Sequence, residues 1–288
     1  MIFWLKLFLV PGLVVIVTLA VRRWGPAVGG WLAGLPIVAG PVLVFYALEQ
    51  GAAFAAAAAH ATLAGLVATV AFAIVYAHLS TRLPWYACMA LGWFVFAGVV
   101  VGLYALQPGL VLSLLLLIAA TVFGGRLLSR VRPPSPSASA RQAAEPGLRT
   151  TAGEADPRPD AYVGRVQPKA DPPRDLPIRL IATATLVILL TGLAARLGPA
   201  WSGLLNAFPV LTTIVAVFSH IQRGTAAAVA FLNGYLQAIV GFGLFCVVMA
   251  TGLESLGLGW ALIAALAAQL AWHGVLVSRA ASASNSPY

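Results

Sequence analysis

Charged residues are scarce in this 288-residue sequence. Asp, Glu, Lys and Arg together make up 9% of it, whereas hydrophobic residues make up 61%, and the mean hydropathy is +0.94. A soluble domain of this size could not bury so many apolar residues, and most of them would be exposed to water. The composition excludes a soluble globular protein and predicts an all-α polytopic transmembrane bundle, with the lipid bilayer as its first partner.

Acidic side chains are missing from the interior of the apolar runs. Six of the eight acids lie between residues 133 and 175, and the other two, Glu49 and Glu254, lie at the ends of runs. Proton relays and cation sites in membranes are commonly built on carboxylates, so the sequence gives them little support. It also contains no P-loop, no HExxH motif and no paired-carboxylate site. We therefore expect neither catalysis nor a cofactor.

Cysteine is almost as scarce. Cys88 and Cys246 lie far apart, each within an apolar run and without CxxC spacing. This placement predicts two buried free thiols, and neither a disulfide framework nor a metal site.

The basic excess does not indicate a nucleic-acid surface. The net charge is +9, but acids and bases cancel in the central segment, so the excess flanks the apolar runs. If the runs cross the membrane alternately, most bases fall on one side, which the positive-inside rule assigns to the cytoplasm. We expect the N-terminus outside, and the central segment and C-terminus in the cytoplasm. The bases on that side are Arg22, Arg23, Arg82, Arg126, Arg130, Arg132, Arg179, Arg223 and Arg279.

One membrane crossing needs about 20 apolar residues, and with this length the sequence divides into nine predicted spans. Five lie in residues 1–130 and four in residues 177–280. Residues 131–176 are rich in Pro, Ser and Ala and predict a disordered cytoplasmic linker, and residues 281–288 form a short tail. The spans run approximately over 3–21, 27–48, 52–77, 84–106, 109–128, 177–195, 199–220, 225–250 and 256–278.

The two halves of the sequence resemble each other. Residues 18–57 align without a gap on residues 191–230, a constant offset of 173 positions, and the matches include Gly25 with Gly198 and Gly51 with Gly224. Such matches carry weight because glycine and proline determine backbone geometry. Since five spans precede the second copy, the copies enter the membrane from opposite sides. This predicts an inverted-topology repeat, which is typical of secondary transporters and also occurs in some channels and scaffolds.

Proline interrupts one span in each copy, within WLAGLPIVAGP at residues 31–41 and LLNAFPVLTTI at residues 204–214. It removes a backbone hydrogen bond and pushes the preceding residue out of helical geometry. Unwound backbone at membrane depth either lines a wet cavity or is buried in protein. The interruptions therefore predict either a solute site or two ordinary kinks, and both alternatives stay open. The candidate site residues are Gly34, Pro36, Gly40, Asn206, Pro209, Thr212 and Thr213.

Polar side chains also interrupt the spans that follow. His60 lies in an alanine-rich run, and the aligned residue in the second copy is Asn233, with Gln237 one turn further on. We expect His60 and Asn233 to face each other and to contact a solute or carry a proton. The alternative is that they are hydrogen-bonded between helices. Gln269 and His273 form an i, i+4 pair, which indicates a polar wall on the last span.

The second copy contains the stretch SGLLNAFPVLTTIVAVFSHIQRGTAAAVAFLNG. It is similar to the GlpM-type family of small bacterial inner-membrane proteins, which have a GL-x3-FP element, a polar RG corner and then an alanine-bearing helix. The resemblance covers residues 177–278 and implies a four-helix unit of a bacterial inner membrane, fused here in two copies. The first copy departs from it at Leu35 and Gln50, and no site residue carries over. The matching positions are Gly203, Leu204, Phe208, Pro209, Arg223, Gly224 and 226–228.

Together these features predict a permease or facilitator for a small polar or anionic solute or an envelope precursor, working by alternating access. The competing prediction is a non-catalytic membrane subunit of cell-envelope or exopolysaccharide machinery. A homo-oligomer or an envelope-complex partner is compatible with both predictions, and a nucleic-acid partner with neither.

Overall fold

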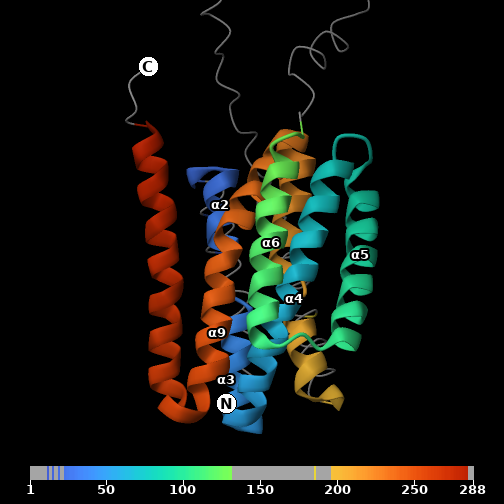
Figure 1. Cartoon of the computed structure of the whole chain (residues 1–288). Helices are drawn as coiled ribbons and strands as arrows, with labels where there is room; N and C mark the ends of the chain where they lie inside the picture. The colour runs from blue at the N-terminus through green and yellow to red at the C-terminus, as the bar shows by residue number, and fades with distance from the viewer. Residues whose placement is uncertain are drawn as a thin grey trace, which may run out of the picture.

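The computed structural model describes residues 23–131 and 196–284, together with the isolated positions 12, 15, 19 and 185. Every regular element within these residues is a helix, which confirms the all-α class for the part described. The helices are α2 (Pro26–Ala33), α3 (Ala39–Gln50), α4 (Ala52–Leu79), α5 (Trp85–Leu106), α6 (Leu110–Leu128) and α9 (Val210–Ser284), and residues 196–206 are helical as well (Figure 1).

The helix α9 is not a single rod. Gly224 has φ 80° and ψ 178°, and Gly257 has φ 74° and ψ 166°, so the chain leaves helical geometry at both positions. A positive φ is costly for residues with a Cβ, and glycine lets the chain reverse direction there. We refer to residues 210–223, 225–256 and 258–284 as the first, middle and last rods of α9.

The described part contains six assigned helices, fewer than the nine predicted spans. Two predicted spans, 3–21 and 177–195, lie outside the described residues apart from isolated positions, and so does most of the predicted linker. The predicted span 27–48 is two shorter helices, α2 and α3. The helix α9 continues to Ser284, which lies within the predicted tail of residues 281–288.

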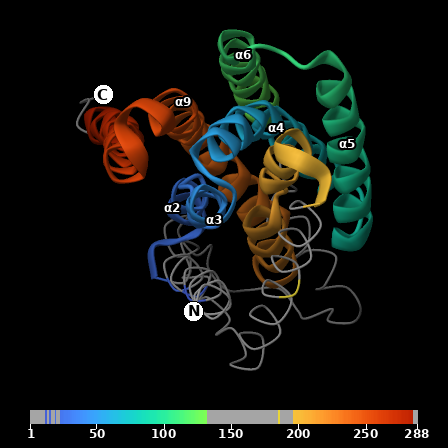
Figure 2. The ribbon, with the colours of Figure 1, turned by 90° about the horizontal axis from the view of Figure 1, so that it is seen from below.

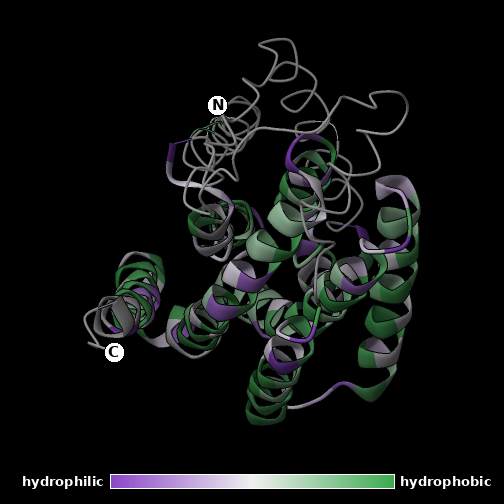
Figure 3. Cartoon of the chain, turned by 90° about the horizontal axis from the view of Figure 1, so that it is seen from above, coloured by the Kyte–Doolittle hydropathy of each residue, from purple (hydrophilic) through white to green (hydrophobic). Residues whose placement is uncertain are grey.

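Four segments are long and apolar enough to cross a membrane: α4, α5, α6 and residues 196–279. The outward faces of these helices are hydrophobic, as the colouring in Figure 3 shows. Phe94 on α5 is 78% exposed and Trp260 on the last rod is 70% exposed. Large apolar side chains at such positions are stable against lipid and not against water, so the architecture is that of a membrane protein.

The helices run alternately up and down in the view of Figure 1. The pair α2 and α3 descends, α4 rises, α5 descends and α6 rises. The segment 196–223 rises, the middle rod descends and the last rod rises. Seen from below, α4 and the middle rod lie in the interior, while α5 and the last rod lie at opposite sides (Figure 2). Thus 26–50 and 196–223 are antiparallel.

Two glycines allow the interior helices to approach closely. A Cβ at Gly30 on α2 would collide with the backbone of Phe231 and Tyr235, and one at Gly203 would collide with the backbone of Ala58 and Thr62. The offset of 173 residues exchanges Gly30 with Gly203, Ala58 with Phe231 and Thr62 with Tyr235. Small residues at helix contacts let backbones pack directly, which is the main source of attraction between helices in lipid. These two contacts bring both interrupted spans against the interior helices.

Candidate functional site

Both predicted interruptions are present as breaks in helical structure. The first break, residues 34–38, separates α2 from α3, and the second break, residues 207–209, separates helix 196–206 from α9. Their backbone hydrogen bonds correspond one to one. In the first break the N–H groups of Leu35, Ile37 and Gly40 donate to Leu32, Leu35 and Pro36 at 3.1, 2.7 and 2.8 Å. In the second, those of Phe208, Val210 and Thr213 donate to Leu205, Phe208 and Pro209 at 2.9, 2.7 and 2.8 Å.

Each break leaves a half-helix with an open N-terminus. Among the described residues, the N–H groups of Val38 and Ala39 donate to no backbone carbonyl, and neither do those of Leu211 and Thr212. The N-terminus of a helix carries a partial positive charge, and its free N–H groups attract acceptors and anions. The two breaks therefore place two donor-rich helix ends in the interior of the protein.

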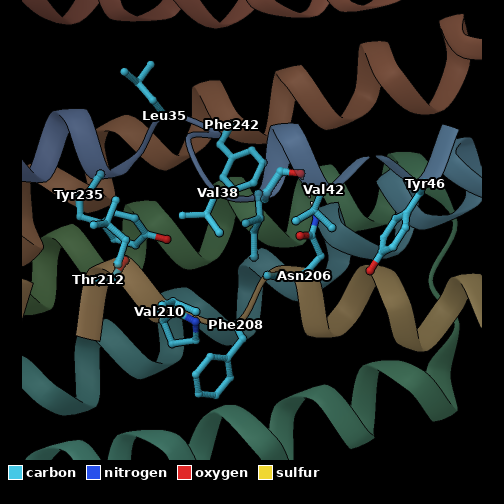
Figure 4. Close-up of a pocket in the computed structure, with 16 residues that line it drawn as sticks. Leu35, Val38, Val42, Tyr46, Asn206, Phe208, Val210, Thr212, Tyr235 and Phe242 are labelled. Carbon is cyan, nitrogen blue, oxygen red and sulfur yellow. Dashed lines mark hydrogen bonds between the residues drawn. The ribbon is translucent and has the colours of Figure 1, made fainter. Parts of the chain in front are cut away.

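Both helix ends border one small cavity, which we call the central cavity. Its volume is about 60 Å³, enough for a few water molecules or one small solute. Figure 4 shows side chains from both breaks and from the middle rod around it. The lining residues are Ala33, Leu35, Val38, Ala39, Val42, Tyr46, Leu66, Asn206, Ala207, Phe208, Pro209, Val210, Leu211, Thr212, Tyr235 and Phe242.

Asn206 is the most polar side chain of the central cavity. Its Nδ2 donates to the carbonyl oxygen of Ala39 and to Oγ1 of Thr62, each at 3.3 Å. Thr62 Oγ1 in turn donates to the Ala58 carbonyl at 2.8 Å, so it accepts from Asn206. Both partners of Nδ2 are acceptors, which determines the orientation of the amide. The amide oxygen accepts no hydrogen bond from the described residues and is available to a ligand.

Thr212 and Tyr235 supply two further polar groups, a pair of buried hydroxyls that both line the cavity. Of the predicted site residues, Thr212 and Pro209 line the cavity as well. Thr213 does not, because its Oγ1 accepts a hydrogen bond from Trp93 Nε1 at 3.1 Å on the side that faces α5. Successive helix residues point about 100° apart, so neighbouring threonines serve different surfaces.

The candidate residues of the first break lie on a different surface from Asn206. Pro36 and Gly40 line a separate, almost wholly apolar cavity of about 460 Å³ between α3 and the last rod, which we call the side cavity. The carbonyl of Gly34 accepts a hydrogen bond from Gln269. The first break reaches the central cavity instead through Leu35, Val38 and Ala39, whose identities gave no polar signal.

His60 and Asn233 do not face each other, which corrects that expectation. His60 Nε2 donates to the Pro108 carbonyl at 3.0 Å and lines a third cavity of about 330 Å³, the lower cavity. Asn233 and Gln237 are exposed. His60 is nine residues past Gly51 and Asn233 nine residues past Gly224, and these two turns lie at opposite ends of the bundle (Figure 1). An antiparallel arrangement thus separates aligned residues that are far from the midplane.

Several polar contacts of the site had no sequence signal. Thr69 Oγ1 donates to the Ala207 carbonyl at 2.6 Å. A single hydroxyl in an apolar helix is common and usually bonds its own backbone, so this contact could not be singled out beforehand. Gln269 of the predicted polar wall is fully buried against the first break.

Comparison of the chain with protein-family models, with curated proteins and with solved structures finds no match.

Proposed function

We propose that the chain is a permease of two inverted-topology repeats that carries a small polar or anionic solute across a membrane by alternating access. The observation that carries the proposal is the pair of equivalent breaks around one cavity. Broken helices near the midplane, at the interface of two repeats, are where secondary transporters bind their solutes. An ordinary proline kink needs neither a matched partner nor a shared cavity.

Backbone geometry supports the repeat. The turns at Gly25 and Gly198 have φ 91° and 82°, and those at Gly51 and Gly224 have φ 93° and 80°. These pairs keep the 173-residue offset, as do the hydrogen bonds of the two breaks and the contacts of Gly30 and Gly203. Equivalent segments that run in opposite directions (Figure 1) are what an inverted repeat requires. The nine-span count, with spans 3–21 and 177–195, belongs to the same proposal.

The chemistry of the central cavity supports the solute class. Two half-helix N-termini offer free N–H groups, the Asn206 amide oxygen offers an acceptor, and none of the described residues that line the cavity is acidic. Donors together with a positive dipole end favour an anion or a neutral polar group over a cation. The volume of about 60 Å³ limits the solute in this state to one of a few heavy atoms.

The lower cavity suggests how the solute enters. It is lined by His60, Tyr104 and Pro199 near the end of the bundle where Gly198 and Gly51 lie. The 173-residue offset converts His60 and Ala64 of its lining into Asn233 and Gln237. In the proposed alternate state the two halves exchange conformations, so a cavity lined by Asn233 and Gln237 opens at the other end.

The distribution of charge supports an orientation. Arg82 in the α4–α5 turn, Arg223 beside the Gly224 turn and Arg279 near the end of α9 belong to the upper end of Figure 1. We assign this end to the cytoplasm, which places the N-terminus outside and the linker inside. The resemblance of the second copy to GlpM-type proteins makes the bacterial inner membrane the expected location.

A flux assay tests the proposal. The purified protein is reconstituted into liposomes. The liposomes are loaded with each member of a panel of small anions and small neutral polar solutes, and the efflux of that solute is measured. We expect flux of at least one solute, and its loss in Asn206→Leu because that variant removes the amide from the cavity. Thr251→Val is the matched control, since Thr251 is exposed and bonds only the Val247 carbonyl of its own helix. Unchanged flux in Asn206→Leu would contradict the site.

The competing function is a non-catalytic subunit of envelope or exopolysaccharide machinery. It would be favoured if Asn206→Leu preserved the cellular function of the protein and if one defined partner co-purified in constant stoichiometry with wild type and variant alike.

A further inference from the structure

The side cavity has a smaller equivalent in the second copy. This second space, which we call the α5 cavity, lies between α5 and the first rod of α9, and its volume is about 180 Å³ against about 460 Å³ for the side cavity. The residues that line the α5 cavity are Met89, Trp93, Val210, Thr213, Ile214, Val217 and Phe218. The 173-residue offset converts all of them into lining residues of the side cavity, in the same order Leu262, Leu266, Ile37, Gly40, Pro41, Val44 and Phe45. The two cavities therefore occupy equivalent positions beside the two breaks.

The two cavities differ in size because aromatic rings fill the space in the second copy. Phe208 packs against Trp93 and Phe96, with ring centroids 5.5 and 5.2 Å apart. The aligned residues of the first copy all line the side cavity, and they are Leu35, Leu266 and Gln269. Atoms that face an empty space lose their dispersion contacts on that side. The side cavity therefore has room for an occupant where the second copy uses its own side chains.

The side cavity is continuous with the lipid-facing surface of the last rod. Leu266 and Leu270 line it and are 41% and 62% exposed, and the neighbouring Ile263 is 58% exposed. Gln269 is the one polar side chain among the lining residues, and it is fully buried. Walls of this kind offer no hydrogen bond to a polar solute, which would lose its hydration there. They suit a hydrocarbon chain that enters from the bilayer.

The position of the side cavity matches one leaflet. The helix α3 descends from the first break, and the last rod rises from the turn at Gly257, so the cavity lies in the lower half of the bundle (Figure 1). Leu262 and Leu270 are eight positions apart, which is about 12 Å along a helix. The hydrocarbon of one leaflet is about 15 Å thick, half of the bilayer core. The cavity thus has the length and direction of one acyl chain of the lower leaflet, and its deep end is at Pro36.

The charges at the lower end favour one kind of headgroup. Glu49 follows Phe45 by four positions and so lies one turn below it on the same face of α3. Glu254 precedes the turn at Gly257 that leads into the last rod. Arg196 belongs to helix 196–206, which α3 separates from the last rod (Figure 2). Carboxylates repel an anionic headgroup and attract an ammonium group, so a zwitterionic phospholipid fits better than an anionic one.

We propose that the side cavity binds one acyl chain of a zwitterionic phospholipid from the lower leaflet, with the end of the chain against the first break. This binding site does not rest on the proposed function. In the proposed permease the two halves exchange conformations, so the side cavity would shrink and the α5 cavity would open to the other leaflet. A bound chain then favours the conformation described here, and this consequence does rest on the proposed function.

The test locates the chain by photo-crosslinking. The full-length protein is placed in nanodiscs of phosphatidylethanolamine that contain a trace of the same lipid with a diazirine at the end of one chain, and the labelled residues are identified by mass spectrometry after irradiation. We expect residues 35–37 to be labelled several-fold more than Ile118, which is 39% exposed near the middle of α6. A diazirine close to the headgroup should label Phe45 and Leu262 instead. Labelling of residues 35–37 no stronger than that of Ile118 would overturn the site.

Variants show whether the label enters through the side cavity. Leu266→Trp introduces the side chain of the aligned Trp93, should fill the cavity, and should lower labelling of residues 35–37 to the level of Ile118. Ile263→Trp is the matched control, since it adds the same side chain on the exposed face of the last rod and should leave the labelling unchanged. A monodisperse peak in size-exclusion chromatography shows that each variant is folded. If Leu266→Trp does not fold, Leu35→Phe fills the cavity in its place. Labelling that persists in a folded filled variant would overturn the site.

Two further outcomes concern the occupant. A benzophenone side chain at Leu270 should form an adduct with phospholipid, whereas a crosslink to residues 3–21 or to a second copy of the chain would mean that protein covers the cavity and would overturn the proposal. Nanodiscs of phosphatidylglycerol should give weaker labelling, and equal labelling would overturn the choice of headgroup. If the chain is located but no panel solute is transported, the lipid site stands and the permease proposal fails. If solutes are transported and residues 35–37 are not labelled, the reverse holds.

Discussion

The two breaks share one backbone conformation but are held by different side chains. The Ala207 carbonyl of the second break accepts from the Thr69 hydroxyl at 2.6 Å, whereas the equivalent Gly34 carbonyl accepts from the Gln269 amide at 3.4 Å. The hydroxyl contact of the second break is therefore the shorter and stronger of the two, and the amide contact of the first break lies at the long end of hydrogen-bond distances.

The second break is also more tightly packed than the first. Phe208 of the second break is in contact with Trp93 and Phe96 of α5, with ring centroids 5.5 and 5.2 Å apart. Its counterpart Leu35 borders the side cavity of about 460 Å³, where packing is absent on one side. Polar ligating groups follow the tighter break, since Asn206 and Thr212 align with Ala33 and Ala39. In the proposed permease, the second break is therefore the part that holds the solute, and the first break is the part that moves.

The largest effects are expected where the halves are alike. Gly30→Leu and Gly203→Leu both force a side chain into the backbone of a facing helix, and overpacking of this kind costs about 3 kcal/mol or more. Both variants should lose the monodisperse folded peak in detergent size-exclusion chromatography. Gly98→Leu on α5 is the control, since no atom lies within 4 Å of the Cβ it would add. A large loss at only one of the two sites would break the equivalence of the halves.

A smaller loss of stability is expected when a packed side chain of either break is truncated, and this loss should differ between the two breaks. Phe208→Ala removes aromatic contacts with two rings and should destabilise the protein by about 2 kcal/mol, while Leu35→Ala beside the side cavity should cost less than about 1 kcal/mol. The measurement is reversible unfolding in mixed micelles. Equal losses would mean that the first break is packed as tightly as the second.

The smallest loss of stability is expected when the side-chain hydrogen-bond donor of either break is removed. Thr69→Val leaves the Ala207 carbonyl without a side-chain donor and should cost about 1 kcal/mol. Gln269→Leu also removes a donor, but it eliminates a buried amide oxygen that has no hydrogen-bond partner. The free energy lost with the hydrogen bond should therefore be nearly offset by the removal of that unpaired oxygen. The same unfolding assay compares the two variants. If Gln269→Leu lowered the free energy of unfolding more than Thr69→Val does, the hydrogen bond at the first break would not be the weaker one.

The positions of the breaks could be predicted from sequence, because proline acts on its own backbone whatever surrounds it. Pro36 and Pro209 interrupt their helices as expected, and Asn206 and Thr212, which the sequence predicts as site residues, line the central cavity. Both lie within three residues of the second proline, where the chain direction is set locally.

The surface that each side chain faces could not be predicted, because it depends on how the half-helices turn after the break. Gly34, Pro36 and Gly40 face the last rod and the side cavity, and Thr213 faces α5. The pairing of His60 with Asn233 failed for a related reason. In an antiparallel arrangement, aligned residues approach each other only near the midplane, and His60 and Asn233 each lie nine residues past turns at opposite ends of the bundle (Figure 1).

The central claim is that the two halves are inverted in the membrane, and the sidedness of two aligned positions tests it most directly. Trp24 and Leu197 are 64% and 44% exposed, flank the equivalent Gly-Pro turns and are separated by the 173-residue offset. Each is replaced by cysteine in a background without Cys88 and Cys246, and intact cells are treated with a membrane-impermeant thiol reagent, with permeabilised cells as the reference. The account predicts labelling at position 197 and none at position 24 until the cells are permeabilised. Equal labelling of both positions in intact cells would contradict it.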